Sequence, residues 1–135
     1  MKKLLMVTVM LFMALASQAQ KVTGPTLTWE NKGNHDFGEV MQGNKVEHVY
    51  KFTNTGNEPL ILTNVQTTCG CTLPKSWPRD PIMPGGTGEL VIAFDSSGKP
   101  MGKLERTTTV VSNAANADAS QIKFSATITE KKVVN

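Results

Sequence analysis

The sequence predicts an all-β protein, an antiparallel β-sandwich of about seven strands. Short segments rich in Val, Ile, Thr and Phe show apolar and polar residues in alternation, which is the pattern of a half-buried strand. Turn-forming residues separate these segments at spacings of about 10 to 20 residues. Strands and amphipathic helices do not alternate along the chain, which disfavours a parallel α/β sheet.

The strand pattern is clearest in KVEHVYKFTN, where every second residue from Val46 to Phe52, His48 included, falls on one face. The turn NTGNEP at 54–59 ends this segment. The predicted strands are 26–30, 35–40, 45–54, 60–65, 89–94, 103–111 and 121–129.

A proline-rich segment, LPKSWPRDPIMPGGTG, occupies residues 73–88 and contains four prolines and three glycines. Proline has no N–H to donate to a sheet, so we expect no extended regular element here. Trp77 lies within it and has two interpretations. It is either an exposed anchor for a partner protein or a sugar, or a cover over one end of the core.

The N-terminus has the three parts of a secretory signal: Lys2 and Lys3, an apolar run from Leu4 to Ala16, and small residues in SQAQ. This run of thirteen residues spans only about 20 Å, short of a membrane core of roughly 30 Å. We therefore expect a signal peptide at 1–19, cleavage near Gln20, and a periplasmic or secreted protein without a membrane span. A lead-in at 20–33, a domain at 34–129 and a charged tail at 130–135 complete the prediction.

The net charge of +3 falls to +1 when the two lysines of the signal are removed. A nearly neutral mature chain disfavours nucleic-acid binding, which needs a basic face. Cysteines in an exported protein meet an oxidising compartment, where a disulfide is the default expectation.

A set of motifs, in order, resembles the exported bacterial family known as domain of unknown function 1573, over about residues 34 to 128. The resemblance implies an immunoglobulin-like sandwich, akin to the Hydin and major-sperm-protein class, and implies no activity. The motifs that carry it are Asp36-Phe37-Gly38, Asn54-Thr55-Gly56, Pro59-Leu60, Cys69-Gly70-Cys71-Thr72, Pro81-Ile82 and Pro84-Gly85.

Cys69 and Cys71 are the two cysteines of the chain. In an extended strand their Cα atoms would lie about 6.5 to 7 Å apart, at the upper limit for a disulfide, but Gly70 can bend the backbone and close the gap. Four interpretations stay open: a local disulfide or reversible redox pair, two free thiols with at least one packed as an apolar side chain, a metal site, and a catalytic nucleophile.

The metal hypothesis combines Cys69 and Cys71 with His35 and His48, a ligand count that suits zinc. The spacing matches no common zinc motif, and each histidine has a structural interpretation. His48 shares an apolar strand face, and His35 precedes a turn. The soft ligands that copper prefers could come from three methionines in or beside loops, Met41, Met83 and Met101.

No pair of carboxylates, nucleophile with a base, or phosphate-binding loop is recognisable, so we expect no enzyme and no cofactor. We predict a non-catalytic immunoglobulin-like domain that binds an envelope protein or a glycan through loop region 67–86. The alternative is a periplasmic redox or metal-handling protein that uses the Cys-Gly-Cys motif. The candidate binding residues are Cys69, Gly70, Cys71, Thr72 and Trp77.

Overall fold

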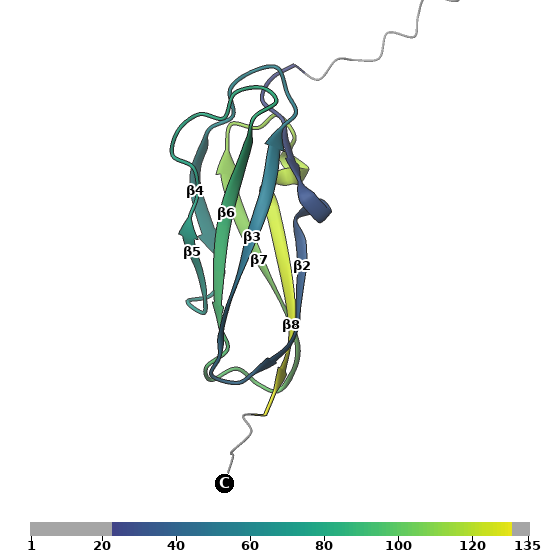
Figure 1. Ribbon diagram of the computed structural model, residues 1–135, viewed down its shortest axis with the longest axis vertical. Coiled ribbons are helices and arrows are strands. Elements are labelled where there is room, and N and C mark those ends of the chain that lie inside the picture. The colour runs from purple at the N-terminus through teal and green to yellow at the C-terminus, as the bar shows by residue number, and fades with distance from the viewer. Residues whose placement is uncertain (1–22, 131–135) are drawn as a thin grey trace, which may run out of the picture.

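The computed structural model describes residues 23–130, which fold into two four-stranded β-sheets packed face to face (Figure 1). Within these residues no helix is long and apolar enough to cross a membrane. The predicted signal peptide and tail residues 131–135 lie outside the described part. The strands are β1 (Leu27–Trp29), β2 (Asn34–Met41), β3 (Lys45–Asn54), β4 (Leu62–Thr67), β5 (Thr72–Ser76), β6 (Thr87–Asp95), β7 (Gly102–Ser112) and β8 (Gln121–Thr129).

The first sheet has the strand order β1-β3-β6-β5 and the second sheet the order β2-β8-β7-β4. This confirms the predicted sandwich. One pairing corrects the expectation of wholly antiparallel sheets, because β2 and β8 run parallel. No hairpin separates β1 from β2: a short 3-10 segment, η2 (Glu30–Gly33), carries the chain from one sheet to the other. Strand β2 therefore enters the second sheet without reversing.

Left-handed backbone conformations make this change of sheet possible. Asn31 and Lys32 have φ angles of 49° and 56°, and Gly33 has a φ of 74°. Strand β1, which lies in the segment predicted as a lead-in, is hydrogen-bonded to β3 and so belongs to the first sheet. It is only three residues long, so it covers one end of β3 and leaves the half around His48 without a neighbour on that side.

Strand β5 is an eighth strand that the sequence pattern does not predict, because Pro74 lies in its middle. It forms the edge of the first sheet and pairs with β6 alone. The Cys71 carbonyl accepts a hydrogen bond from the Asp95 amide at 2.9 Å, so alternation along the strand turns the nitrogen of Pro74 away from β6. An edge position of this kind is where a sheet tolerates proline.

The core lies between the sheets and is built from the faces that the alternation predicts. On β3, Tyr50 and Phe52 are buried, and on β6, Phe94 is fully buried. Phe94 contacts Phe124 of the second sheet, with 5.1 Å between ring centroids. Trp29 of β1 packs against Phe52 at the same centroid distance, 5.1 Å. The largest fully buried side chains are Phe52, Phe94, Leu27, Leu60, Leu90, Ile92, Ile122 and Val110.

Candidate functional site

The Cys-Gly-Cys motif lies where the chain crosses from the second sheet to the first, between β4 and β5. These two strands lie at the same side of the sandwich (Figure 1). Cys69 and Cys71 form a disulfide with their Cα atoms 5.3 Å apart, closer than an extended strand allows. Thr72 N–H donates to the Cys69 carbonyl at 3.3 Å, which closes the turn. Gly70 at its tip is exposed, with open space around it.

The disulfide is tied to the sandwich on its Cys71 side. Both cysteines are half-buried, and Cys71 packs against the core. Its Sγ lies 3.8 Å from the Thr72 hydroxyl, and Thr72 is buried. The Cys71 carbonyl bonds to β6, as described for β5. Cys69 lies in the connecting turn, where its carbonyl accepts from the Thr67 hydroxyl at 3.3 Å.

Trp77 is half-buried in the segment after β5 and packs against the core. The guanidinium carbon of Arg79 lies 3.9 Å from the centroid of the Trp77 ring, a cation–π contact. The indole Nε1 is buried and has no hydrogen-bond partner among residues 23–130. The ring thus touches the core and also carries an exposed arginine on one face.

Two apolar side chains in loop region 67–86 face solvent. Leu73 of β5 is 55% exposed, and Met83, in the connection to β6, is 61% exposed. They are the most exposed large apolar side chains in the described part of the chain, since the next, Met101, is 48% exposed. Pro78, next to Trp77, is half-buried.

The four residues of the metal hypothesis do not form one cluster. Among residues 23–130 no group of three or more His, Cys, Asp or Glu side chains could hold a metal ion. The sulfurs of Cys69 and Cys71 are joined to each other at the β4–β5 side. His35 and His48 lie on β2 and β3, and β6 separates β3 from β5 within the first sheet. His35 lies on β2, within the predicted strand 35–40, so its alternative interpretation as a turn residue is wrong.

The two histidines stack on each other instead. Their ring centroids are 3.5 Å apart and their planes differ by 9°. Parallel planes at this separation cannot both contain one metal ion about 2 Å from each ring nitrogen. Burial lowers the pKa of both imidazoles, Asp36 partly opposes this at His35, and the charge of His35 lowers the pKa of His48 further.

The three methionines do not gather either. Met41 lies opposite Thr129 at one end of the second sheet, and Met101 precedes Gly102, which lies opposite Ile128 at the same end. Met83 lies beside Ile82, which bridges to Leu60 ahead of β4. All three are exposed.

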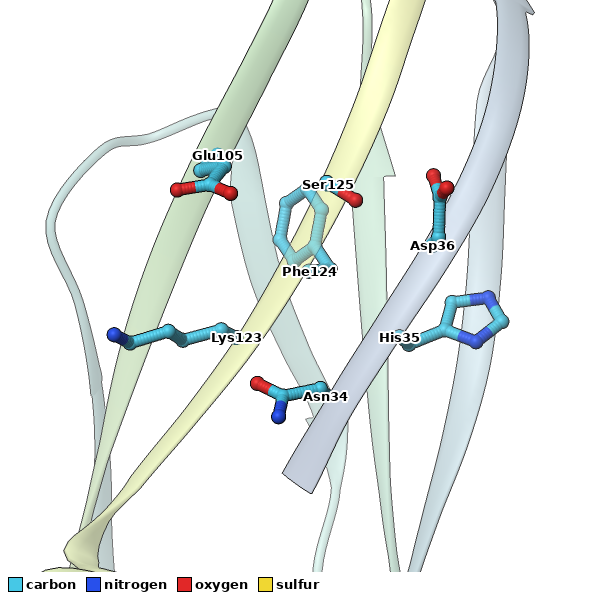
Figure 2. Close-up of a pocket in the computed structure, with 7 residues that line it drawn as sticks. All are labelled: Asn34, His35, Asp36, Glu105, Lys123, Phe124 and Ser125. Atoms are coloured by element: carbon cyan, nitrogen blue, oxygen red, sulfur yellow. The ribbon is translucent and has the colours of Figure 1, made fainter. Parts of the chain in front are cut away.

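A shallow groove of about 260 Å³ on the second sheet is a feature that the sequence does not predict. Its residues come from β2, β7 and β8, which are far apart in the sequence, and no motif connects them. Asp36, Ser125 and Glu105 form one row across the three strands. The lining residues, drawn in Figure 2, are Asn34, His35, Asp36, Glu105, Lys123, Phe124 and Ser125.

The row is held together locally. The Gly38 amide donates to Asp36 Oδ1 at 2.9 Å, and this bond, with a second from Ser125, lowers the pKa of the Asp36 carboxyl. Phe124 is only 2% exposed and the His35 ring is already stacked on His48, so neither ring of the groove offers a free face to a sugar. We therefore place the candidate site in loop region 67–86 rather than in the groove.

Solved structures with the same architecture define the class of this protein. A protein of unknown function from Porphyromonas gingivalis W83 superposes with a TM-score of 0.66 at 20% identity, covering 84% of this chain and 51% of that chain. PapD-like domain 7 of human CEP192 superposes with a TM-score of 0.59 at 12% identity, covering 88% of this chain and 98% of that chain. The VesB protease of Vibrio cholerae superposes with a TM-score of 0.55 at 13% identity, covering 79% of this chain and 32% of that chain. At these identities the likeness shows the fold alone, which is that of an immunoglobulin-like β-sandwich.

The sequence over residues 27–128 matches the family described as "Protein of unknown function (DUF1573)", and the chain belongs to that family. This confirms the family resemblance noted in the motifs. No curated protein sequence matches the chain. The chain spans about half the length of the Porphyromonas gingivalis protein to which it is similar.

Proposed function

We propose that this protein is an exported, non-catalytic binding module of the cell envelope, and that loop region 67–86 contacts the partner. The observation that carries the proposal is the exposure of Leu73 and Met83, 55% and 61%, in this one region. The same loop region contains Trp77 and Arg79, and exposed apolar residues, tryptophan and arginine are the residue types found at protein interfaces. The disulfide and the pairing of β5 with β6 hold the start of the region in place.

The geometry favours a protein partner over a glycan. A sugar would need a free aromatic face for stacking, and Arg79 covers one face of Trp77 while the ring also packs against the core. Leu73 and Met83, in contrast, are free to enter apolar pockets of a partner. Export is supported by the signal pattern of residues 1–19 and by a disulfide in the folded domain.

Site-specific photocrosslinking in cells that produce the full chain tests this proposal. The crosslinker replaces Leu73 or Met83 in turn, and Val111, on β7 of the other sheet and 38% exposed, is the control position. We expect a discrete crosslinked protein from positions 73 and 83 and none from 111. N-terminal sequencing of the same protein checks export, because it should begin near Gln20. Equal crosslinking at all three positions contradicts the assignment of the site.

A second function, thiol–disulfide exchange, is favoured by the disulfide itself. A bond between residues two apart closes a very small loop, so it adds little to folding stability through the unfolded chain. Both sulfurs belong to half-buried residues at the side of the sandwich, rather than to the centre of the core. Equilibration of the oxidised protein with glutathione buffers tests this function, and we expect reversible reduction in the range of periplasmic redox proteins.

A further inference from the structure

Arg106 is a charged residue on the inner face of β7. The inward-facing residues of this part of β7 are Leu104, Arg106, Thr108 and Val110, and Val110 is fully buried. Arg106 Nε is buried and has no hydrogen-bond partner, and no carboxylate of residues 23–130 forms an ion pair with this side chain. Its Nη1 donates to the Glu105 carbonyl at 2.9 Å. A buried Nε–H without an acceptor is costly, so it calls for an explanation.

The register of both sheets places Arg106 at the level of the disulfide. Arg106 pairs with Phe124 on β8, and Phe124 contacts Phe94 on β6 across the core. Phe94 pairs in turn with Thr72, the residue after Cys71. Strand β7 is the neighbour of β8, and β5 is the neighbour of β6. Arg106 on β7 and Thr72 on β5 therefore lie at the same level along the strands as the contact between Phe124 and Phe94.

The end of β4 leads to the same position. The last pair between β4 and β7 is Thr67 with Thr108, so β4 stops before it reaches Arg106. After Thr67 the chain no longer pairs with β7. It passes through Cys69–Gly70–Cys71 to β5 of the other sheet. The inner face of β7 beside Arg106 is thus left open toward the turn that holds the disulfide.

We infer that Arg106 is a positioning residue for thiol–disulfide exchange, which stabilises the thiolate that Cys71 becomes when the disulfide opens. The inference rests on the second proposed function and assigns its residues. A guanidinium carries a permanent charge, and a nearby cation favours a thiolate over a thiol. The substrate is a dithiol, such as two cysteines of another exported protein.

The exchange has two steps. A substrate thiolate attacks Cys69 Sγ, which forms a mixed disulfide and releases Cys71 as a thiolate toward Arg106. The second substrate thiolate then attacks the substrate sulfur of the mixed disulfide and releases Cys69 as a thiolate, which takes a proton from water. The substrate dithiol is oxidised to a disulfide by two electrons, and the disulfide of this protein is reduced to the Cys69 thiol and the Cys71 thiolate. We assign Cys71 as the leaving group because the residue after it, Thr72, lies at the level of Arg106 in the register of the two sheets.

Alkylation of Cys71 as a function of pH tests the role of Arg106. All variants carry Cys69→Ser, so that Cys71 is the single cysteine of the chain. Arg106→Gln and Arg106→Met remove the charge, and Arg106→Lys keeps it. Lys103→Gln is the matched control, because it removes the same charge from an exposed position of the same strand.

We expect an alkylation profile with a midpoint below the ordinary thiol value of about 8.5 in the background protein. Either neutral variant at Arg106 should raise that midpoint and slow alkylation at pH 7, by up to tenfold for each pH unit. Arg106→Lys and Lys103→Gln should resemble the background. Having two neutral variants keeps the test valid if one folds poorly, which thermal unfolding shows.

The same profile in the background, the neutral variants and the Lys103 control would overturn the role of Arg106. A separate measurement tests the exchange itself, with both cysteines present and a dithiol peptide as the substrate. A disulfide that this peptide never reduces contradicts the second proposed function, whatever the alkylation profile shows. The two failures are therefore distinguishable.

Discussion

His35 of β2 and His48 of β3 stack face to face across the gap between the two sheets, 3.5 Å between ring centroids. Phe37 meets the His35 ring edge-on at 4.6 Å, and Tyr50 meets the His48 ring in the same way at 4.6 Å. This row of four rings lies where the short β1 no longer covers β3. It joins the sheets at a side that backbone pairing leaves open, and two protonated imidazoles stacked there would repel each other.

We predict that the free energy of unfolding decreases as the pH falls below about 6.5, the ordinary pKa of histidine. Burial lowers the pKa of both histidines in the folded state, so the unfolded state binds protons first as pH falls. The stability that the two histidines contribute is therefore fully present above their pKa in the unfolded state. It is lost progressively as the pH falls toward their lower pKa values in the folded state. Urea unfolding at pH 7.5 and pH 5.5 measures the difference. His48→Phe keeps an aromatic ring in the row and should make the difference smaller.

Gly88 of β6 lies directly opposite Phe52 of β3, and the Phe52 ring occupies the space that a Cβ at position 88 would need. We predict that Gly88→Ala lowers the free energy of unfolding by about 1 to 3 kcal/mol, because the buried Phe52 must move. Gly70→Ala is the control: a Cβ there meets nothing within 4 Å, so its effect should stay within about 0.5 kcal/mol. Chemical denaturation measures the free energy of unfolding of both variants. Equal decreases in the two variants would contradict the described packing of Phe52 against Gly88.

The features of the fold that the sequence predicts are those that depend on residues close together in the chain. Alternation in 45–54 and 89–94 reports inward faces directly, because every second side chain of a strand shares a face. The sequence did not predict β5 because Pro74 has no N–H to donate to a sheet. The strand pairing shows that the Pro74 nitrogen points away from β6, where no donor is needed. The parallel pairing of β2 with β8 joins segments that are remote in the sequence, so no local pattern could indicate it.

The candidate site divides in the same way. The Cys-Gly-Cys motif was visible in the sequence, and its disulfide was one of the open interpretations. The groove around Asp36 and Glu105 depends on a row across three strands, which no motif signals. The sequence also carries a signal for Arg106. In KLERTTTVV it shares the period-two face of Leu104 and Val110, and an arginine on an apolar face is unusual.

Removing the Phe52 side chain should be costly. Phe52 is 1% exposed and contacts Trp29, so Phe52→Ala leaves a cavity and is predicted to lower the free energy of unfolding by about 3 to 5 kcal/mol. Val49→Ala, on the outer face of the same strand and 38% exposed, should lower it by less than about 1 kcal/mol. A loss below about 1 kcal/mol at position 52 would place this residue outside the core.

Asn54 is fully buried, and its side chain joins three segments by four hydrogen bonds. Nδ2 donates to the carbonyls of Glu58 and Ile82 at 2.7 and 2.8 Å, and Oδ1 accepts from the amides of Gly56 and Thr26 at 3.0 and 3.3 Å. Asn54→Ala removes all four bonds. The Ile82 carbonyl keeps its bond from the Leu60 amide, but the other three backbone groups lose their Asn54 partner, so we predict a loss of roughly 2 to 4 kcal/mol in the free energy of unfolding.

Asn113→Ala is the matched control for Asn54→Ala. Asn113 also bonds the backbone through both side-chain atoms, with Ile61 and Pro59 at 2.8 and 3.1 Å, but it is exposed. Water can replace its bonds, so its removal should lower the free energy of unfolding by about 1 kcal/mol or less. Similar losses in both variants would show that burial does not decide the cost.

Replacing both cysteines separates stability from function. We predict that Cys69→Ser with Cys71→Ser lowers the free energy of unfolding by only about 1 kcal/mol, because a bond between residues two apart constrains the unfolded chain very little. The core and the pairing of β5 with β6 remain in the variant. Denaturant unfolding of wild type and variant, in oxidising and reducing buffer, measures this. If the cooperative transition disappears in the variant, the disulfide is a structural link. Retention of the transition together with loss of dithiol oxidation assigns the pair to exchange, because its sulfurs are then needed for chemistry and not for the fold.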